Sequence, residues 1–238
     1  MHEIIDLHTH VLPKMDDGSH GTVMSVEMLK RMKAMGITVV CGTSHYYRSE
    51  ESIDSFCERR SASYERLTDA CEKEEAELPR VIPGAEVAFF HGISEEEKLD
   101  RLCYDGTNTI LLEMPFTDWT SYNVEEVKSL VLDRRMKVIL AHVERFTFSK
   151  TNREALRHLS ELNLWFQVNG ENFTSFFGKK NGFNHLMMSS RHLLGSDAHN
   201  LDKRPPNLDA ARSYVGKKLG REELERMDAE AEKLILGV

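Results

Sequence analysis

The chain has 238 residues, of which 40% are hydrophobic and 29% are charged, and its formal net charge is -8 at pH 7. This composition is typical of a globular protein, and the negative charge argues against a nucleic-acid surface, which needs clustered Lys and Arg. No apolar run approaches the ~18 residues that a membrane-spanning helix requires, so we expect no membrane insertion. The length fits one large α/β domain, and we expect a single domain over residues 1–238.

The N-terminus and the cysteines bear on the cellular compartment. Residues 1–3 carry no basic segment and lead directly into an apolar run, so we expect no signal peptide. The four cysteines show no CxxC spacing and are expected to be reduced thiols rather than disulfides or zinc ligands. Together these features predict a cytoplasmic protein.

Seven apolar, β-branched runs are predicted to be strands. In chain order they are residues 4–10, 37–45, 81–86, 109–113, 137–142, 164–169 and 192–197. Six of them end on a good metal-ligand type, whereas the run 164–169 ends on Asn169, a weak ligand. Helical patterns lie between or after the runs, as a β–α alternation requires, at residues 22–35, 50–77, 123–134, 151–162, 180–191 and 207–236.

This alternation predicts the fold. In barrels of parallel strands, the catalytic groups lie at the C-terminal ends of the strands, where the following loops form one mouth. We therefore expect a distorted seven-stranded (β/α) barrel, related to the eight-stranded TIM barrel, with its site at that mouth. An open parallel sheet is the main alternative.

The residues at the strand ends predict a metal site. Positions i and i+2 of a strand point to the same face, so the neutral imidazoles of His8 and His10 can hold one ion. The later runs end on His45, Glu86, Glu113, His142 and Asp197, and His199 follows two residues after the last. A carboxylate that ends an apolar run is costly to bury unless it is solvated or coordinated.

These residues belong to stretches that occur in a recognisable order. The stretches are His8-Thr9-His10, Asp16-Asp17-Gly18, Thr43-Ser44-His45, Gly84-Ala85-Glu86, Leu112-Glu113, His142-Val143-Glu144-Arg145 and residues 196–206, SDAHNLDKRPP. Over nearly its whole length the chain resembles the polymerase and histidinol phosphatase (PHP) superfamily. Within it, the chain looks like the bacterial CpsB/YwqE type of metal-dependent tyrosine-protein phosphatase, found in capsule and exopolysaccharide operons.

The resemblance implies three divalent metal ions, with manganese favoured and iron or zinc as alternatives. The implied ligands are His8, His10, Glu86 and Asp197 for the first ion, Glu86, Glu113 and His142 for the second, and Asp17, His45 and His199 for the third. Asp16, next to the ligand Asp17, is expected to shape a turn instead.

The resemblance also implies the reaction, which is hydrolysis of phosphotyrosine by attack of a metal-bound hydroxide. Arg145 and Arg204 match arginines of the family and are expected to bind the phosphate oxygens as bidentate forks. The implied partner is a phosphotyrosine protein, in particular the tail of a bacterial tyrosine kinase that controls polysaccharide export. A phenolate leaving group has a pKa of ~10, so a strong general acid is less necessary than for phosphoserine.

Two other activities stay open. One is a small-molecule phosphatase such as histidinol-phosphatase, and the other is an amidohydrolase, although those enzymes usually bridge their metals with a modified Lys rather than a residue such as Glu86. A non-catalytic metal-binding module is a more remote reading. A preference for flat aromatic phosphates would follow if Tyr46, Phe89 or Trp119 packs on the substrate. The loops hold further aromatic candidates for that role: Tyr47, Phe90, Phe116, Phe173, Phe176 and Phe177.

Overall fold

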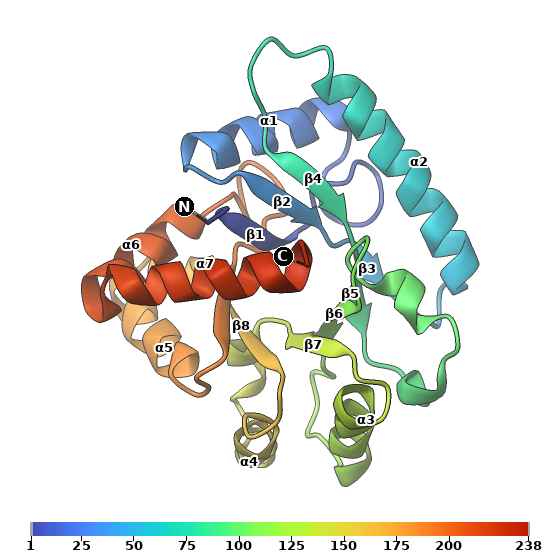
Figure 1. The fold of residues 1–238 in the computed structure, drawn as a ribbon, viewed down its shortest axis with the longest axis vertical. Helices are drawn as coiled ribbons and strands as arrows, with labels where there is room; N and C mark the ends of the chain where they lie inside the picture. Colours follow the sequence, from blue (N-terminus) through green and yellow to red (C-terminus); the bar gives the residue numbers. More distant parts are fainter. Residues whose placement is uncertain (1, 238) are drawn as a thin grey trace.

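Parallel strands form the centre of the molecule and helices surround them, as Figure 1 shows for the computed structural model, which describes residues 2–237. In this range the strands lie in two sheets. The first sheet contains, in spatial order, β1 (Ile5–Thr9), β2 (Val39–Gly42) and β4 (Arg80–Pro83). The second contains β3 (His45–Tyr46), β5 (Glu86–Ala88), β6 (Thr109–Glu113), β7 (Lys137–Leu140), β8 (Trp165–Asn169) and β9 (His192–Gly195).

The strands divide into two sheets because two of the seven predicted runs are interrupted. The run 37–45 gives β2 and then β3, and the run 81–86 gives β4 and then β5. At the interruption the backbone N–H of Glu86 bonds to the carbonyls of both Thr43 and Ser44, at 3.2 and 3.0 Å. One donor shared between two successive carbonyls breaks the even spacing of a parallel ladder.

The outer edges of the two sheets lie next to each other. Thr9 and Ala198 form an isolated parallel bridge, and the N–H of His10 donates to the carbonyl of Ala198 at 2.8 Å. The predicted α/β class and the parallel strands are confirmed. A closed seven-stranded barrel is not found within residues 2–237, because the ladders stop at the two interruptions.

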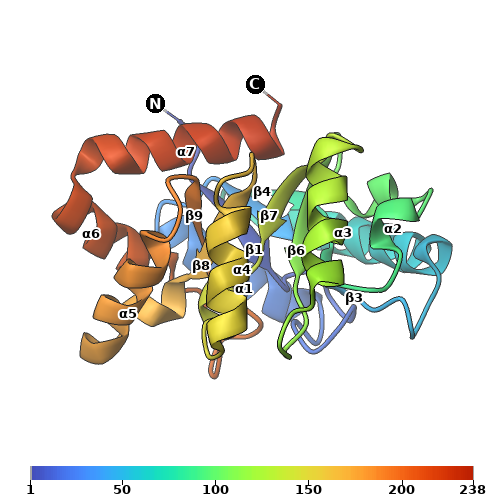
Figure 2. The same ribbon diagram turned by 90° about the horizontal axis from the view of Figure 1, so that it is seen from below.

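Helices follow most of the strands and cover their outer faces (Figures 1 and 2). They are α1 (Thr22–Ala34), α2 (Ile53–Cys71), α3 (Ser121–Leu132), α4 (Lys150–Leu159), α5 (Phe176–Leu186), α6 (Leu208–Leu219) and α7 (Arg221–Ile235). The short 3-10 helices are η1 (Ile93–Glu95), η2 (Leu99–Leu102), η3 (Val143–Phe146) and η4 (Gly170–Phe173). Within residues 2–237, no helix combines the length and the apolar character that crossing a membrane requires.

The predicted helices differ from the observed ones at several ends. The predicted helix 207–236 is two helices, because Gly220 adopts a left-handed φ of 92° between α6 and α7. The predicted helix 180–191 begins earlier, at Phe176, because the hydroxyl of Ser175 caps it by accepting from a backbone N–H. The helix predicted over residues 50–77 is observed as α2, which begins later and ends earlier, at Ile53–Cys71. Val23, an apolar residue in the first turn of α1, is 79% exposed.

Helix α7 closes the end of the strands at which the chain begins (Figure 2). Its residues Ala231, Leu234 and Ile235 belong to a buried apolar cluster with strand residues such as Ile5. The hydroxyl of Thr109, at the start of β6, donates to the carbonyl of Leu234 at 2.7 Å. A larger apolar cluster fills the space between the strands and the outer helices. The opposite end of the strands is therefore the open end.

Candidate metal centre

The residues predicted to bind metal gather at the open end of the strands. His142 and Asp197 follow β7 and β9 within two residues, as predicted. His45 and Glu86 were expected at the C-terminal ends of strands but instead begin the short strands β3 and β5, because their runs are interrupted just before them. They still reach the same region, since each lies only three residues after the C-terminal end of the preceding strand, β2 or β4.

Glu86 is the residue on which most of these side chains converge, and it is 1% exposed. Its Oε2 lies 3.2 Å from His8 Nε2, 3.3 Å from His10 Nε2 and 3.0 Å from His45 Nδ1. Its other oxygen, Oε1, lies 2.7 Å from His142 Nε2. The two oxygens thus face different imidazoles, which is the geometry that a carboxylate shared between two cations needs.

Asp197 is a second carboxylate shared by several imidazoles. Its Oδ1 lies 3.5 Å from His8 Nε2, 3.4 Å from His10 Nε2 and 3.5 Å from His199 Nδ1. His199 Nε2 lies in turn 3.4 Å from Asp17 Oδ1. The loop that carries Asp17 is thereby joined to the same cluster.

Several buried polar atoms of this cluster have no hydrogen-bond partner among the described residues. These atoms are His8 Nε2, His10 Nε2, His45 Nδ1, Glu86 Oε2 and Asp197 Oδ1. A buried polar atom without a partner is costly, and buried polar groups in folded proteins are nearly always paired. Imidazole nitrogens and carboxylate oxygens that face one another in this way are the donor set of a divalent cation such as Mn, Fe or Zn.

Three groups of ligand atoms lie close enough to hold an ion, with their members within 4.8 Å of one another. They are His8, His10, Glu86 and Asp197; His10, Asp17, His45 and His199; and His45, Glu86 and Glu113. The first group has the residues expected for the first ion. The second adds His10 to the set expected for the third ion, and the third group has His45 where His142 was expected. His142 still contacts this group, because its Nε2 lies 3.3 Å from Glu113 Oε1.

Neighbouring residues fix the orientation of the first two histidines. His8 Nδ1 lies 3.1 Å from Gln167 Oε1, and His10 Nδ1 lies 2.8 Å from Asp16 Oδ2. In each contact Nδ1 faces an acceptor oxygen, and the opposite nitrogen, Nε2, is directed at the cluster. Asp16 also accepts from the N–H groups of Gly18 and His45, at 2.9 Å each, so it shapes the turn as expected. The sequence analysis missed Gln167, although a polar residue in the middle of an apolar run was the available signal.

The two predicted arginines contact Asp197. Arg145 Nη2 donates to Asp197 Oδ2 at 2.8 Å, and Arg204 Nη2 donates to the same oxygen. Asn169 Nδ2 is a third donor to it, at 2.8 Å. The Asp197 oxygen that faces away from the imidazoles is therefore fully hydrogen-bonded. Asn169, considered above only as a weak ligand, holds this carboxylate in place.

Burial and charge shift the pKa values within the cluster. Burial opposes the charge of Glu86, but the surrounding histidines, His8 above all, hold the pKa of this carboxyl well below its usual range. The pKa of Asp197 is lowered in the same way. Burial opposes protonation of His142, but Glu113 and Glu86 raise its pKa to about 9. Protons on imidazoles thus balance the carboxylates, and a cation that binds at neutral pH has to displace them.

The backbone adopts unusual conformations at two of these residues. His142 has a φ of 29° and Asp197 a φ of 54°, in the left-handed region that non-glycine residues seldom occupy. Close backbone approach occurs at Gly18, where a Cβ atom would lie 2.3 Å from His10 Cβ. Residues held in such conformations concentrate at functional sites, where the surrounding structure compensates for the strain.

Three of the nine aromatic residues considered for contact with a substrate are buried instead. Tyr46, Trp119 and Phe173 are at most 3% exposed and pack into the core, so the prediction for Tyr46 and Trp119 was wrong. Phe89 and Phe90 are partly buried and pack against the same core. The side chains of Phe176 and Phe177 lie outside the described part of the structure. Two rings stay near the cluster, Tyr47 over His45 and Phe116 beside His142.

Two hollows border the cluster and share Asp17. One has a volume of about 270 Å³ and is lined by His45, Tyr47 and Arg59 among others. The other has a volume of about 490 Å³ and is lined by His199 and Arg204 among others. The mouth is therefore broad and extends to both sides of the metal-ligand residues.

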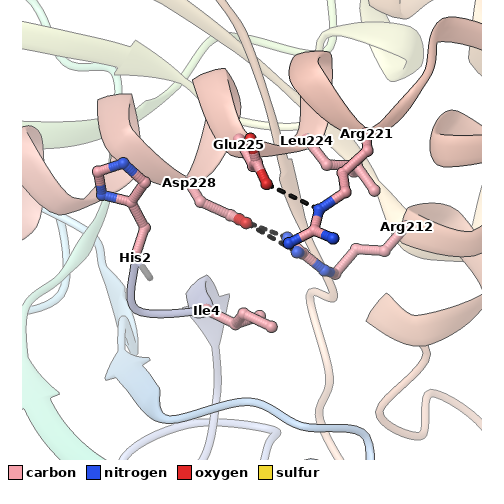
Figure 3. Close-up of a pocket in the computed structure, with 7 residues that line it drawn as sticks. All are labelled: His2, Ile4, Arg212, Arg221, Leu224, Glu225 and Asp228. Carbon is pink, nitrogen blue, oxygen red and sulfur yellow. Dashed lines mark hydrogen bonds and ion pairs between the residues drawn. The ribbon is translucent and has the colours of Figure 1, made fainter.

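A larger hollow, of about 580 Å³, lies at the other end of the strands (Figure 3). It is lined by residues of the N-terminus, α6 and α7, including His2, Ile4 and Leu224. Arg212 and Asp228 form a two-fold hydrogen-bonded ion pair beside it. None of the predicted site residues lines this hollow, and its charged groups are already paired.

Comparisons with known proteins give one consistent result. Residues 4–236 match the family model described as "Capsular polysaccharide synthesis, CpsB/CapC". The chain is 30% identical over 223 residues to the tyrosine-protein phosphatase YwqE of Bacillus subtilis, covering 92% of this chain and 86% of that protein. It also matches a crystal structure from work on YwqE and on CpsB from Streptococcus pneumoniae, described as "unique metal-dependent tyrosine phosphatases". The TM-score is 0.81 at 26% identity, over 98% of this chain and 94% of that one.

A more distant structure shares the fold alone. A histidinol phosphate phosphatase from Lactococcus lactis, complexed with zinc, L-histidinol and phosphate, has a TM-score of 0.54 at 12% identity. The match covers 91% of this chain and 93% of that one.

Proposed function

This chain belongs to the CpsB/CapC family of capsular polysaccharide synthesis, and we propose that it is a metal-dependent phosphatase that hydrolyses phosphotyrosine on proteins. The activity is that of a phosphoric monoester hydrolase, as the names of its relatives indicate. The observation that carries the proposal is the set of five unpaired, buried ligand atoms on His8, His10, His45, Glu86 and Asp197. A divalent cation among these atoms would satisfy all five of them at once.

We assign three divalent ions to this cluster, with manganese favoured over iron and zinc. The proposed ligands are His8, His10, Glu86 and Asp197 for the first ion, Glu86, Glu113 and His142 for the second, and Asp17, His45 and His199 for the third. The mixed nitrogen and oxygen donors support this range of metals. When bound, the ions would activate a water molecule as the nucleophile and neutralise the phosphoryl oxygens.

Arg145 and Arg204 are assigned to the phosphate group. Their side chains are 29% and 30% exposed at the mouth, and each already uses one nitrogen to hold Asp197. A guanidinium carries five N–H donors, so it can hold this carboxylate and a phosphate oxygen at the same time. The arginines would then keep Asp197 directed at the first ion while they stabilise the transferred phosphoryl group.

A protein substrate is supported by the shape of the mouth. The hollows of about 270 and 490 Å³ on either side of Asp17 leave room for peptide chain around the phosphorylated side chain. Membership of a capsule-synthesis family supports a bacterial tyrosine kinase as the phosphorylated partner. The cytoplasmic location stays a prediction from the sequence.

The adjacency of Thr9 and Ala198 supports one distorted seven-stranded barrel interrupted at two places.

A substrate panel tests the proposal. Protein loaded with Mn²⁺ is assayed side by side on a phosphotyrosine peptide, the same peptide with phosphoserine, histidinol phosphate and a set of amides. The highest kcat/KM is expected for the phosphotyrosine peptide. A higher value for histidinol phosphate would favour the small-molecule phosphatase instead, and amide cleavage without phosphatase activity would favour an amidohydrolase.

A further inference from the structure

Phe116 is an exposed aromatic ring at the edge of the metal cluster. It lies in the loop after β6, three residues beyond the ligand Glu113, and is 56% exposed. Its ring centroid lies 6.2 Å from that of His142, with the two planes inclined by 22°. On its inner side the ring contacts the fully buried Phe146, with centroids 5.1 Å apart. One part of the ring is thus supported by the protein while the rest faces solvent next to the site.

The loop that carries Phe116 is held firmly on both sides of it. Trp119 is buried, and its indole N–H donates to the carbonyl of Pro115 at 2.9 Å. The fully buried Asn152 of α4 accepts from the N–H of Trp119 at 2.8 Å and donates to the carbonyl of Thr117 at 3.0 Å. The backbone immediately before and after Phe116 is therefore fixed, and this fixed backbone holds the ring in its exposed position.

We propose that Phe116 binds the aromatic ring of the phosphotyrosine and thereby gives the enzyme its preference for aryl over alkyl phosphates. The inference rests on the proposed phosphatase function and names the residue that recognises the leaving group. Arg145 lies on the same side of the mouth, because it follows His142 by three residues and its N–H bonds to the His142 carbonyl at 2.9 Å. A phosphate held by Arg145 places the attached ring within reach of Phe116, where offset or edge-to-face packing is favourable.

Tyr47 is the competing candidate on the other side of the cluster. Its ring stacks on His45, with centroids 5.3 Å apart, and it is partly buried. The hollow that Tyr47 lines is also lined by the carboxylates Asp17, Glu50 and Glu51. A phenol that faces carboxylates is better suited to hydrogen bonding in the mouth than to packing against an apolar ring. The ring of Phe116 carries no polar group, and its exposed part is free to pack against an apolar ring.

The test compares substrates that differ only in the leaving group. In Phe116→Ala, kcat/KM for a phosphotyrosine peptide is expected to fall roughly 3- to 10-fold, mainly through KM, from the loss of one aromatic contact. The value for the same peptide with phosphoserine is expected to change less than about two-fold, since an alkyl group makes no such contact. Phe116→Tyr keeps an aromatic ring at this position and should retain the wild-type preference for the phosphotyrosine peptide over the phosphoserine peptide.

A binding measurement provides a second readout, independent of turnover. The affinity of a non-hydrolysable phosphonate analogue of the phosphotyrosine peptide, measured by calorimetry, should fall in Phe116→Ala by a similar factor, with unchanged metal content. Phe148→Ala is the matched control, because Phe148 is 60% exposed on the following loop, and should leave both values unchanged.

Several outcomes would contradict the role proposed for Phe116. Equal losses for the tyrosine and serine peptides, or unchanged affinity for the analogue, would overturn it and leave the phosphatase function intact. A loss of the aryl preference in Tyr47→Leu but not in Phe116→Ala would also overturn it. A wild-type protein that hydrolyses no phosphate monoester would overturn the proposed function, and this inference with it.

Discussion

Asp16 Oδ2 lies 2.8 Å from His10 Nδ1, and this contact directs the opposite nitrogen of the His10 ring into the metal cluster. Burial opposes the charge of Asp16, but His10 and two backbone N–H groups lower the pKa of this carboxyl. The carboxylate therefore stays charged and available as an acceptor. Outer partners of this kind fix the tautomer and the direction of a ligand histidine.

Asp16→Asn should therefore weaken metal binding without removing a ligand. The expected loss of Mn²⁺ affinity is about 10- to 100-fold, as is typical when a partner of a ligand histidine is replaced. Titration of chelator-treated protein with Mn²⁺ measures this loss. Asp209→Asn, an exposed substitution at the start of α6, is the control and should bind as the wild type does. Unchanged affinity in Asp16→Asn would limit Asp16 to shaping the turn.

Substitution of either arginine should lower turnover while the metals stay bound. Arg145→Ala or Arg204→Ala is expected to reduce hydrolysis of a phosphotyrosine peptide by roughly 10- to 1000-fold, through loss of one charged transition-state partner. Metal content should not change, because Asn169 still holds Asp197 Oδ2 at 2.8 Å. Arg66→Ala, on the exposed face of α2, is the control. Metal loss in the arginine variants would mean that they serve mainly to position Asp197.

Gly18→Ala should disrupt the site through backbone crowding alone. A Cβ at this position would lie 2.3 Å from His10 Cβ and 2.4 Å from the His10 carbonyl oxygen, so the loop or the histidine has to move. We expect lower metal content and a lower Tm, measured by elemental analysis and thermal unfolding. Gly21→Ala is the matched control, since no atom lies within 4 Å of its added Cβ. Equal metal content in the two variants would contradict the role assigned to this close approach.

The metal-free protein should lose stability as the pH rises. The pKa of His142 is raised from 6.5 to about 9 in the folded state, despite burial, by Glu113 and Glu86. The contribution of His142 to the free energy of unfolding is fully present below the unfolded pKa of 6.5, and it is lost as the pH rises through 9. The pKa of His10 is also raised, which adds in the same direction.

Urea unfolding in chelator, repeated across this pH range, measures the decline. The Mn²⁺-loaded protein should show a smaller one, because its ligand imidazoles are already neutral. His142→Asn, which keeps a residue that tolerates a positive φ, should also show a smaller decline. Parallel curves for the metal-free wild type and this variant would show that His142 is not protonated in the folded state.

The sequence predicted the strands and the ligand types well because both are local patterns. Each apolar run contains a strand, although two of the runs are split into two strands each, and the ligand types at the ends of the runs are visible in the sequence itself. The interruptions before His45 and Glu86 depend on hydrogen bonds between runs that are distant in the sequence, so no local pattern reveals them. The contact between Gln167 and His8 spans 159 residues and was missed for the same reason. The buried ring of Trp119 likewise packs on Phe146, which lies in another element.

The proposed metal dependence is tested by release of phosphate from a phosphotyrosine peptide while Mn²⁺ is added back to chelator-treated protein. We expect no hydrolysis in chelator, recovery that saturates with Mn²⁺, and no recovery in Glu86→Gln, because Glu86 faces four imidazoles of the cluster. Full activity in chelator would contradict it, and so would the absence of hydrolysis at every Mn²⁺ concentration.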